Sequence, residues 1–247
     1  MIQIDKHDIS YGGENISFRL ERTARRKTIS ISVGFDGIRV LAPVDMIDQD
    51  VAAHVRKKAP WVIKKLADYR ELASETQPKE FVSGESFHYL GRPYRLRVIE
   101  DPNAVVTRIS ARGQTLVAPV LPHQHYLIRR ASIRSGLRQW YVEKAMRRFP
   151  ERLSAVSTTL GIDTPRMLVV EQSKRWGSCD KNGKIRLNWR LVMAPASLID
   201  YVIAHEACHI LYHDHSHRFW RSLETIMPDY ESRINRLDKI GHRLIWS

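Results

Sequence analysis

The feature that most constrains this chain is the pentapeptide HEACH at residues 205–209, which follows the apolar run LIDYVIA. The two histidines are four residues apart, so an α-helix places both imidazole rings on one face. The preceding residues are apolar at helical spacing, which predicts that this helix is buried. His205 and His209 can then share one zinc ion at Zn–N distances of about 2.0–2.1 Å. Glu206 lies beside the pair and can accept a proton from a water on the metal without being a ligand itself.

A catalytic zinc needs a third protein ligand and an open coordination position. His213 is a poor candidate, because a continuing helix would place it about 12 Å from His205 at a rise of about 1.5 Å per residue. Asp214 tolerates turn conformations and can end the helix, after which His215 would turn back toward the metal. The alternatives to His215 as third ligand are Glu224 from the following helix, His217 and Asp214.

The segment SKRWGSCDKNG, residues 173–183, is predicted to form a loop at the edge of the cleft. Arg175 could bind a substrate carboxylate or phosphate through two parallel hydrogen bonds, with Ser178 close by on the same loop. The alternative is that Trp176 packs in the core and Arg175 pairs with an acidic residue. Tyr201 lies one helical turn before the first histidine of the pair, so it either reaches the rim of the metal site or packs in the core.

Hydrophobic periodicity predicts an α+β fold with a β-rich N-terminal portion, residues 1–120, and a C-terminal catalytic portion, residues 121–247. In the first portion we expect strands at 16–20, 28–33, 38–43 and 115–119, and a hairpin at 87–101. We also expect a helix that begins near Asp45 or Asp48 and runs to about residue 73, which Pro60 either kinks or splits in two. In the second portion we expect a helix at 123–149 that Pro150 interrupts and that resumes to Gly161, a hairpin of strands 166–172 and 184–192, a helix at 195–212 and a last helix at 216–240.

The chain of 247 residues carries a net charge of +13, with an isoelectric point near 10.0. Such a charge favours polyanionic partners, and Arg130, Arg134 and Arg138 at i,i+4 spacing could form a helix face that follows a phosphate backbone. The alternative is an ordinary solvated face. The sequence shows neither a membrane-length apolar run nor the apolar stretch of a signal peptide, so we expect a cytoplasmic protein without a membrane partner.

Three segments carry a resemblance to a known family: RWGSCDKNGKIRLNWRLVMAP at 175–195, YVIAHEACH at 201–209 and HDHSHRFW at 213–220. They resemble the YgjP-like metal-dependent hydrolases, which belong with the SprT and WLM group of zinc metallopeptidases. The resemblance implies that His205, His209 and His215 bind zinc and that Glu206 is catalytic. It also implies a minimal zincin-like core of helices with a short β-hairpin in the C-terminal portion.

These observations predict a zinc-dependent hydrolase, and foremost a metallopeptidase that uses a Glu-activated zinc-bound water. Its protein or peptide substrates could be associated with nucleic acid, as the basic surface and the SprT-type resemblance suggest. The first alternative is a metal-dependent hydrolase of nucleotide phosphoanhydrides, of the pyrophosphatase type. The second is a non-catalytic zinc-containing module that binds nucleic acid and uses the metal only structurally.

Overall fold

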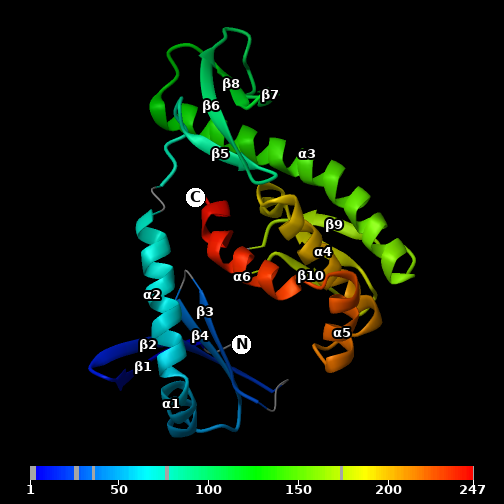
Figure 1. Ribbon diagram of the computed structural model, residues 1–247. Helices are drawn as coiled ribbons and strands as arrows, with labels where there is room; N and C mark the ends of the chain where they lie inside the picture. The colour runs from blue at the N-terminus through cyan, green and yellow to red at the C-terminus, as the bar shows by residue number, and fades with distance from the viewer. Residues whose placement is uncertain (1–3, 25–27, 35–36, 76–77, 173–174, 247) are drawn as a thin grey trace. The chain divides into compact units, whose positions relative to one another are not determined.

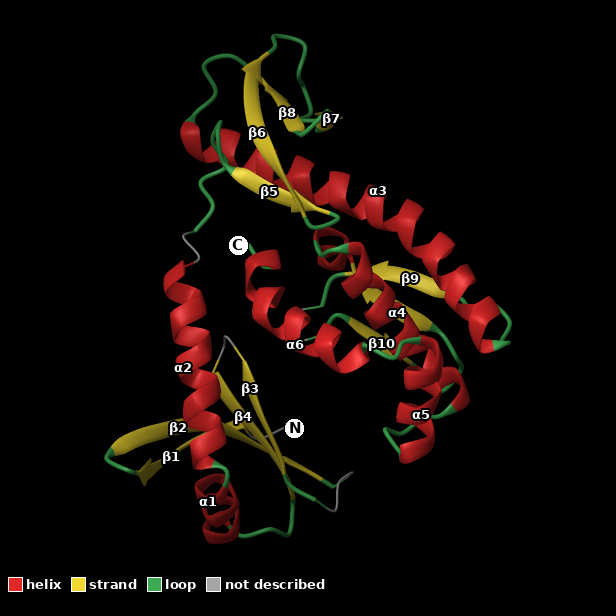
Figure 2. Ribbon diagram, viewed as in Figure 1, coloured by secondary structure: helices red, strands yellow, loops and turns green. Residues whose placement is uncertain are grey.

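The computed structural model describes residues 4–24, 28–34, 37–75, 78–172 and 175–246 (Figure 1). The chain forms two compact units, Met1–Gln77 and Pro78–Ser247. Within the described residues there are six α-helices and three small sheets, which confirms the predicted α+β class (Figure 2). The contacts divide the chain at a different place from the predicted boundary at residue 120, because residues 78–120 share a core with the segments that follow them.

The first unit is a four-stranded sheet with the order β1-β2-β4-β3 and two helices. Its elements are β1 (Ile4–Tyr11), β2 (Glu14–Thr23), β3 (Ser30–Gly34), β4 (Gly37–Pro43), α1 (Asp48–Lys57) and α2 (Ala59–Glu75). β2 and β4 alternate buried and exposed residues, so the buried face contributes Phe18, Leu20 and Val40 to a core with Val51 and Val55 of α1. Of the two alternatives predicted near Pro60, a kink or a split, the structure shows the split: α1 ends at Lys57 and α2 begins at Ala59.

The second unit begins with a sheet whose order is β5-β6-β8-β7. Its strands are β5 (Ser86–Tyr89), β6 (Arg92–Glu100), β7 (Ser110–Arg112) and β8 (Thr115–Val120), so the predicted hairpin at 87–101 and the strand at 115–119 are confirmed. One face buries Phe87, Leu96 and Leu116 against the long helix α3 (Tyr126–Leu160). Tyr141 of that helix also donates a hydrogen bond of 2.8 Å to the carbonyl oxygen of His88.

The predicted interruption of the long helix at Pro150 is wrong, because α3 continues through this residue to Leu160. A proline inside a helix removes one hydrogen bond and crowds the carbonyl four residues earlier. Here Pro150 lies on the exposed side, while Phe149 and Leu153 on either side of it are buried in the core. The packing of these neighbours therefore outweighs the local cost of the proline.

The predicted hairpin between strands 166–172 and 184–192 is also wrong. The strands are β9 (Met167–Val170), β10 (Gly177–Cys179) and β11 (Ile185–Asn188), and β11 pairs antiparallel with β10 and parallel with β9. The intervening segment, which we expected to be only a loop, provides β10 as the hairpin partner. After β11 the chain forms a 3-10 helix, η1 (Trp189–Met193), whose buried side chains continue the core.

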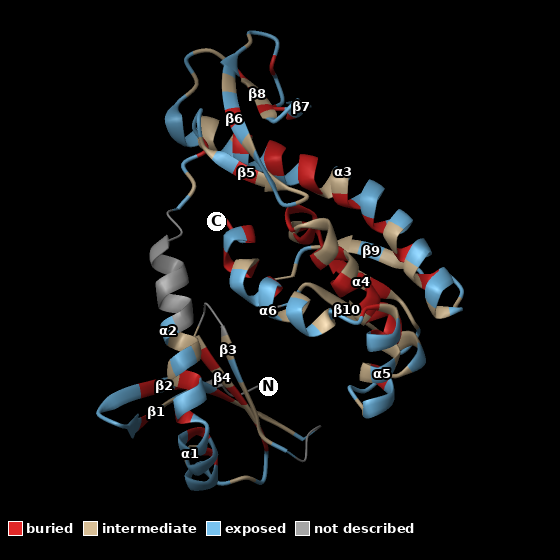
Figure 3. Cartoon of the chain, in the orientation of Figure 1, coloured by how far each residue is buried: buried red, intermediate tan, exposed pale blue. Residues whose placement is uncertain are grey.

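The remaining helices are α4 (Ala196–Leu211), α5 (His217–Ile226) and α6 (Tyr230–Ile240), followed by the short 3-10 helix η2 (Gly241–Leu244). The predicted helix at 195–212 is confirmed, whereas the last predicted helix is divided into α5 and α6 near Pro228. Figure 3 shows α4 buried along most of its length, in contact with α3, α5, α6 and β10. No described helix is both long enough and apolar enough to cross a membrane.

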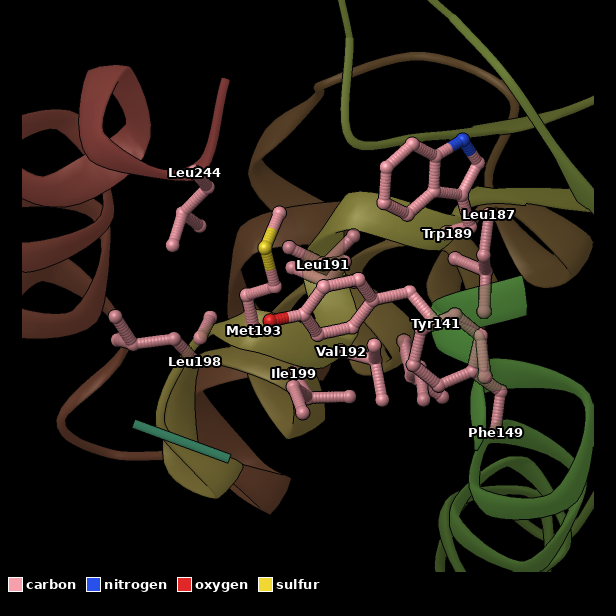
Figure 4. Packing of buried hydrophobic residues seen from close by; sticks show 14 of the residues in the cluster. Tyr141, Phe149, Leu187, Trp189, Leu191, Val192, Met193, Leu198, Ile199 and Leu244 are labelled. Atoms are coloured by element: carbon pink, nitrogen blue, oxygen red, sulfur yellow. The ribbon is translucent and has the colours of Figure 1, made fainter. Parts of the chain in front are cut away.

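Aromatic rings connect these elements at the centre of the core (Figure 4). Tyr141 of α3 stacks on Trp189 of η1 with ring centroids 5.9 Å apart, and Trp246 meets Trp189 edge-on at 5.6 Å. Both Tyr141 and Trp189 are essentially inaccessible to solvent. The segment between β11 and α4 is thereby fixed against α3, which positions the start of the helix that carries HEACH.

The predicted basic face of α3 is mostly engaged within the protein. Arg130 donates to the carbonyl oxygen of Lys79 and lies over the ring of Phe81, and Arg138 forms an ion pair of 2.9 Å with Glu171. Arg134 is exposed. Arg130 and Arg138 would therefore have to bind a phosphate backbone while keeping these internal contacts, or give them up.

Gly136 provides a test of the packing against α3. A β-carbon at this buried helical position would overlap the carbonyl oxygen of Thr107, in the segment before β7. Gly136→Ala should therefore lower the free energy of unfolding by about 1–3 kcal/mol, despite the better helix propensity of alanine. The neighbouring exposed Ser135→Ala is the control and should leave stability unchanged or slightly raised. Urea unfolding of both variants measures the difference, and equal stability would contradict this packing.

Candidate metal centre

The helix α4 presents the two histidines of HEACH near its C-terminal end. Its apolar residues Leu198, Ile199, Val202 and Ile203 are buried, which fixes the rotation of the helix about its axis. His205 and His209 consequently project from one side, with ring centroids 5.0 Å apart. This agrees with the i,i+4 arrangement that the sequence predicts.

The chain leaves the helical conformation at Tyr212, whose backbone is extended. Asp214 then accepts a hydrogen bond from the backbone N–H of Ser216, which closes a local turn. α5 begins directly afterwards at His217. The predicted turn at Asp214 is therefore present, and it brings His215 back to the face of α4 that carries the other two histidines.

The three imidazole rings converge. Nε2 of His215 lies 3.1 Å from Nε2 of His205, and the ring centroids of His209 and His215 are 4.7 Å apart. One ligand atom from each of the three rings lies within 4.8 Å of the corresponding atoms of the other two. Among the residues that the structure describes, this is the group of histidine, cysteine or carboxylate side chains with a geometry suited to a metal ion.

Phe219 forms an apolar support beneath the three histidines. Its ring centroid lies 4.9 Å from that of His205, 4.6 Å from that of His209 and 4.8 Å from that of His215. Trp220, the next residue of α5, lies against His215 with centroids 5.5 Å apart. Phe219 therefore limits the positions of all three imidazole rings, a role that the sequence motif HDHSHRFW does not reveal.

The protonation of the imidazoles suits a divalent cation. Burial, together with the neighbouring His209 and His215, lowers the pKa of His205 to about 3. Partial burial and His209 also lower the pKa of His215. Rings that stay neutral at physiological pH offer nitrogen lone pairs, which are the donors that zinc and related transition metals prefer. The donor set therefore fits a metal ion of this kind.

A hydrogen bond from His209 to a backbone carbonyl oxygen determines which ring nitrogen is available to a metal. Nδ1 of this ring lies 3.0 Å from the carbonyl oxygen of Tyr212, which can only accept, so Nδ1 carries the hydrogen. Nε2 is left as the donor atom. Such an outer contact from a histidine to a backbone carbonyl is typical of metal-binding histidines, because it fixes both the tautomer and the orientation of the ring.

Glu206 is buried beside the histidines and has one backbone hydrogen-bond donor. Burial raises the pKa of its carboxyl group to about 7, while the charge of Arg175 and a hydrogen bond from the backbone of Cys179 act in the opposite direction. Gly177 of β10 allows this approach, because a β-carbon there would lie 2.7 Å from Oε1 of Glu206. A carboxyl group with a pKa near neutrality can both accept and release a proton at physiological pH.

Asn188, a buried residue that the sequence analysis did not identify, supports the loop over Glu206. Its side-chain amide donates to the carbonyl oxygens of Gln172 and Arg175 at 2.7 and 3.3 Å. Its backbone N–H donates to the carbonyl oxygen of Trp176 at 2.8 Å. The available signal was an amide side chain between Leu187 and Trp189, since a buried amide needs partners on a neighbouring segment.

The three tentative substrate-binding residues lie in different surroundings. Arg175 is exposed and close enough to Glu206 for its charge to influence that carboxyl group. Ser178 is half-buried on β10, where Gln172 is its hydrogen-bond partner. Tyr201 is 8% exposed, with its ring centroid 6.0 Å from that of His205, so it packs in the core and also borders the metal centre. Trp176 packs against the hydrophobic core and lies next to Gly241 of η2.

A buried helix that presents HExxH, with a third histidine from the turn that follows, defines a site of the metallohydrolase type. The sequence comparison gives the family: the YgjP-like metallopeptidase domain matches residues 27–240, and the chain belongs to this family. The resemblance seen in the three motifs is thereby confirmed. A comparison with curated protein sequences found no match.

Two solved structures are similar over the part of this chain that they share. One is the metallopeptidase zymogen abylysin of Pyrococcus abyssi, with 21% identity and a TM-score of 0.36, covering 38% of this chain and 95% of that one. The other is the metallopeptidase zymogen jannalysin of Methanocaldococcus jannaschii, with 22% identity and a TM-score of 0.34, covering 39% of this chain and 90% of that one.

Removal of single histidines tests the ligand set. His205→Ala, His209→Ala and His215→Ala should each weaken zinc binding strongly, because two remaining protein ligands hold a divalent ion poorly. His217→Ala and Glu224→Ala are the controls, since both side chains are exposed on α5 and neither belongs to the converging group. Zinc content after dialysis against a chelator measures the effect. Full zinc occupancy in His215→Ala would show that another residue is the third ligand.

The raised pKa of Glu206 predicts a pH-dependent stability of the metal-free protein. The folded state favours the protonated carboxyl group, with a pKa of about 7 against an ordinary value of 4.5. The stability that this preference contributes is complete below pH 4.5 and is lost as the pH rises through 7. Glu206→Gln cannot ionise, so at pH 8 it should be more stable than the wild type by an amount on the order of 2 kcal/mol.

The comparison is made by chemical denaturation of the two metal-free proteins at pH 5 and pH 8. The stability gain of Glu206→Gln should be present at the higher pH and much smaller at the lower pH. The exposed Glu224→Gln is the matched control and should show no such pH dependence. An equal gain at both values would mean that the carboxyl group of Glu206 titrates normally in the folded protein.

Proposed function

We propose that this chain is a zinc-dependent peptidase in which His205, His209 and His215 hold the metal and Glu206 is the general base. The observation that carries the proposal is the position of the buried carboxyl group of Glu206, one residue from His205 on the helix that carries two of the three converging imidazoles. A purely structural metal site has no use for a buried carboxyl group there, because its burial opposes ionisation. A hydrolytic site needs a base within reach of the attacking water.

Zinc is the proposed metal because three imidazoles form a nitrogen donor set, whereas magnesium and calcium prefer oxygen ligands. When bound, zinc supplies a Lewis acid that makes a water molecule more acidic and polarises the carbonyl group of the scissile bond. Three protein ligands also leave a coordination position for these oxygen atoms, in contrast to structural sites with four protein ligands.

Glu206 takes the proton from the attacking water. Burial favours the protonated form of this carboxyl group, so it can hold that proton and then release it to the amine of the departing peptide segment. The hydrogen bond from the backbone N–H of Cys179 fixes the carboxylate orientation, and the absence of a side chain at Gly177 leaves room for it. Glu206 is thus the base, the backbone of Cys179 orients its carboxylate, and burial raises its pKa.

Arg175 is the proposed contact for a negatively charged group of the substrate. It is exposed at the edge of the site, and the side-chain amide of Asn188 donates a hydrogen bond to its backbone carbonyl oxygen. A guanidinium group in this place suits a peptide carboxylate through two parallel hydrogen bonds. It would equally suit the phosphate of a nucleotide, so nucleoside triphosphates belong in the substrate panel.

Glu206→Gln tests the proposed mechanism. Glutamine has nearly the same shape as glutamate but cannot accept the proton at neutral pH, so turnover should fall on the order of 10²–10⁴-fold while zinc content is kept. The assay uses a peptide library and nucleoside triphosphates with zinc-loaded wild type, Glu206→Gln and the control Glu224→Gln. Wild-type turnover by zinc-loaded Glu206→Gln would refute the role of the base. Cleavage of triphosphates alone would replace the peptidase by a phosphoanhydride hydrolase.

A further inference from the structure

The sheet β5-β6-β8-β7 of the second unit has one face that does not contribute to the core. Leu96, Leu116 and Ala118 point to the side of α3 and are buried. Because successive residues of a strand point to opposite faces, their neighbours on β6 and β8 point away from α3. We call this second side the outer face, and Figure 3 shows exposed residues along β6 and at β7.

Three arginines lie together on the outer face. Arg95 and Arg97 are two residues apart on β6, so they share this side, and both are exposed. Thr115 of β8 pairs with Arg95 on one side and with Arg112 of β7 on the other, so these arginines occupy one row across the sheet. Arg108, just before β7, is exposed as well.

Among the described residues of these four strands, no acidic side chain lies on the outer face. The four strands contain a single acidic residue, Glu100, which falls on the α3 side by alternation and forms an ion pair of 3.5 Å with Arg129 of α3. In the described part of the chain, Arg95, Arg97 and Arg112 have no ion pair. Other arginines of the same unit, such as Arg138 and Arg190, are paired with carboxylates.

A cluster of like charges without carboxylates beside it creates a local positive potential, which favours a partner with negative charge. Along β6 the arginines are separated by about 7 Å, and across two strands by about 10 Å. A DNA duplex carries one negative charge per ~1.7 Å of its axis, so several arginines at these separations can each contact a phosphate and release counterions.

We propose that the outer face of this sheet binds the phosphate backbone of duplex DNA without reading its sequence. A single strand fits this face less well, because single-strand binding relies on exposed aromatic rings that stack on the bases. The aromatic residues of these strands point the other way: Tyr89 contacts Tyr94 and Trp140 of α3, and Phe87 is buried. The proposal is independent of the hydrolytic activity, because it rests on residues outside the metal centre.

The experiment compares two triple variants of the full chain. Arg95→Gln, Arg97→Gln and Arg112→Gln together remove the charges of the outer face, and Arg134→Gln, Arg147→Gln and Arg236→Gln together make the same change in net charge at exposed positions on α3 and α6. Binding of a short labelled DNA duplex of arbitrary sequence is measured by fluorescence anisotropy over a series of salt concentrations. Circular dichroism verifies that both variants keep the wild-type fold.

The outer-face variant should bind at least about ten-fold more weakly at low salt, and its salt dependence should fall by about 0.9 in the log–log slope for each lost contact. The control variant should stay close to the wild type. Equal losses in the two variants would overturn the proposal, because binding would then follow net charge alone. It would also be overturned if the wild type bound no duplex at low salt or bound a single strand equally well. The same holds if the outer-face variant lost binding to anionic lipid vesicles but kept its binding to duplex DNA.

Discussion

Three imidazole rings, those of His205, His209 and His215, meet at one point in the second unit. Burial and the mutual repulsion of the rings lower the pKa of His205 to about 3, so the lone pairs remain available to a cation. Phe219 contacts all three rings from one side, and buried apolar residues of α4 fix the direction from which two of them project. The metal centre therefore depends on a helix whose position is set by the core.

The same burial determines the chemistry of Glu206. A carboxyl group with an ordinary pKa would be ionised at neutral pH and a weak proton donor, whereas a pKa of about 7 suits both halves of a proton-transfer cycle. The approach of β10, which needs glycine at position 177, brings a backbone donor to the carboxylate. Asn188 then ties the preceding loop to β11. The loop, the strand and the helix thus contribute separate parts of one site.

Sequence reasoning predicted the histidine pair and the turn that returns His215, because both depend on local geometry. Helical spacing fixes the first, and the turn tendency of Asp214 suggests the second. It was wrong about Pro150, where buried neighbours on both sides keep the helix continuous. It was also wrong about β9 and β11, which pair in parallel and do not form a hairpin. The antiparallel neighbour of β11 is β10 from the intervening segment, and hydrophobic periodicity does not show which strands pair. The contact of Phe219 with the three histidines could not be predicted, because it depends on how α5 packs against α4 and not on local sequence.

The most direct test of this account is a crystal structure of the zinc-loaded protein with anomalous diffraction measured at the zinc absorption edge. The account predicts one strong anomalous peak at about 2.0–2.1 Å from a nitrogen of His205, Nε2 of His209 and a nitrogen of His215, with no fourth protein ligand. A peak elsewhere, or a site closed by a fourth side chain such as that of Glu224, would contradict it.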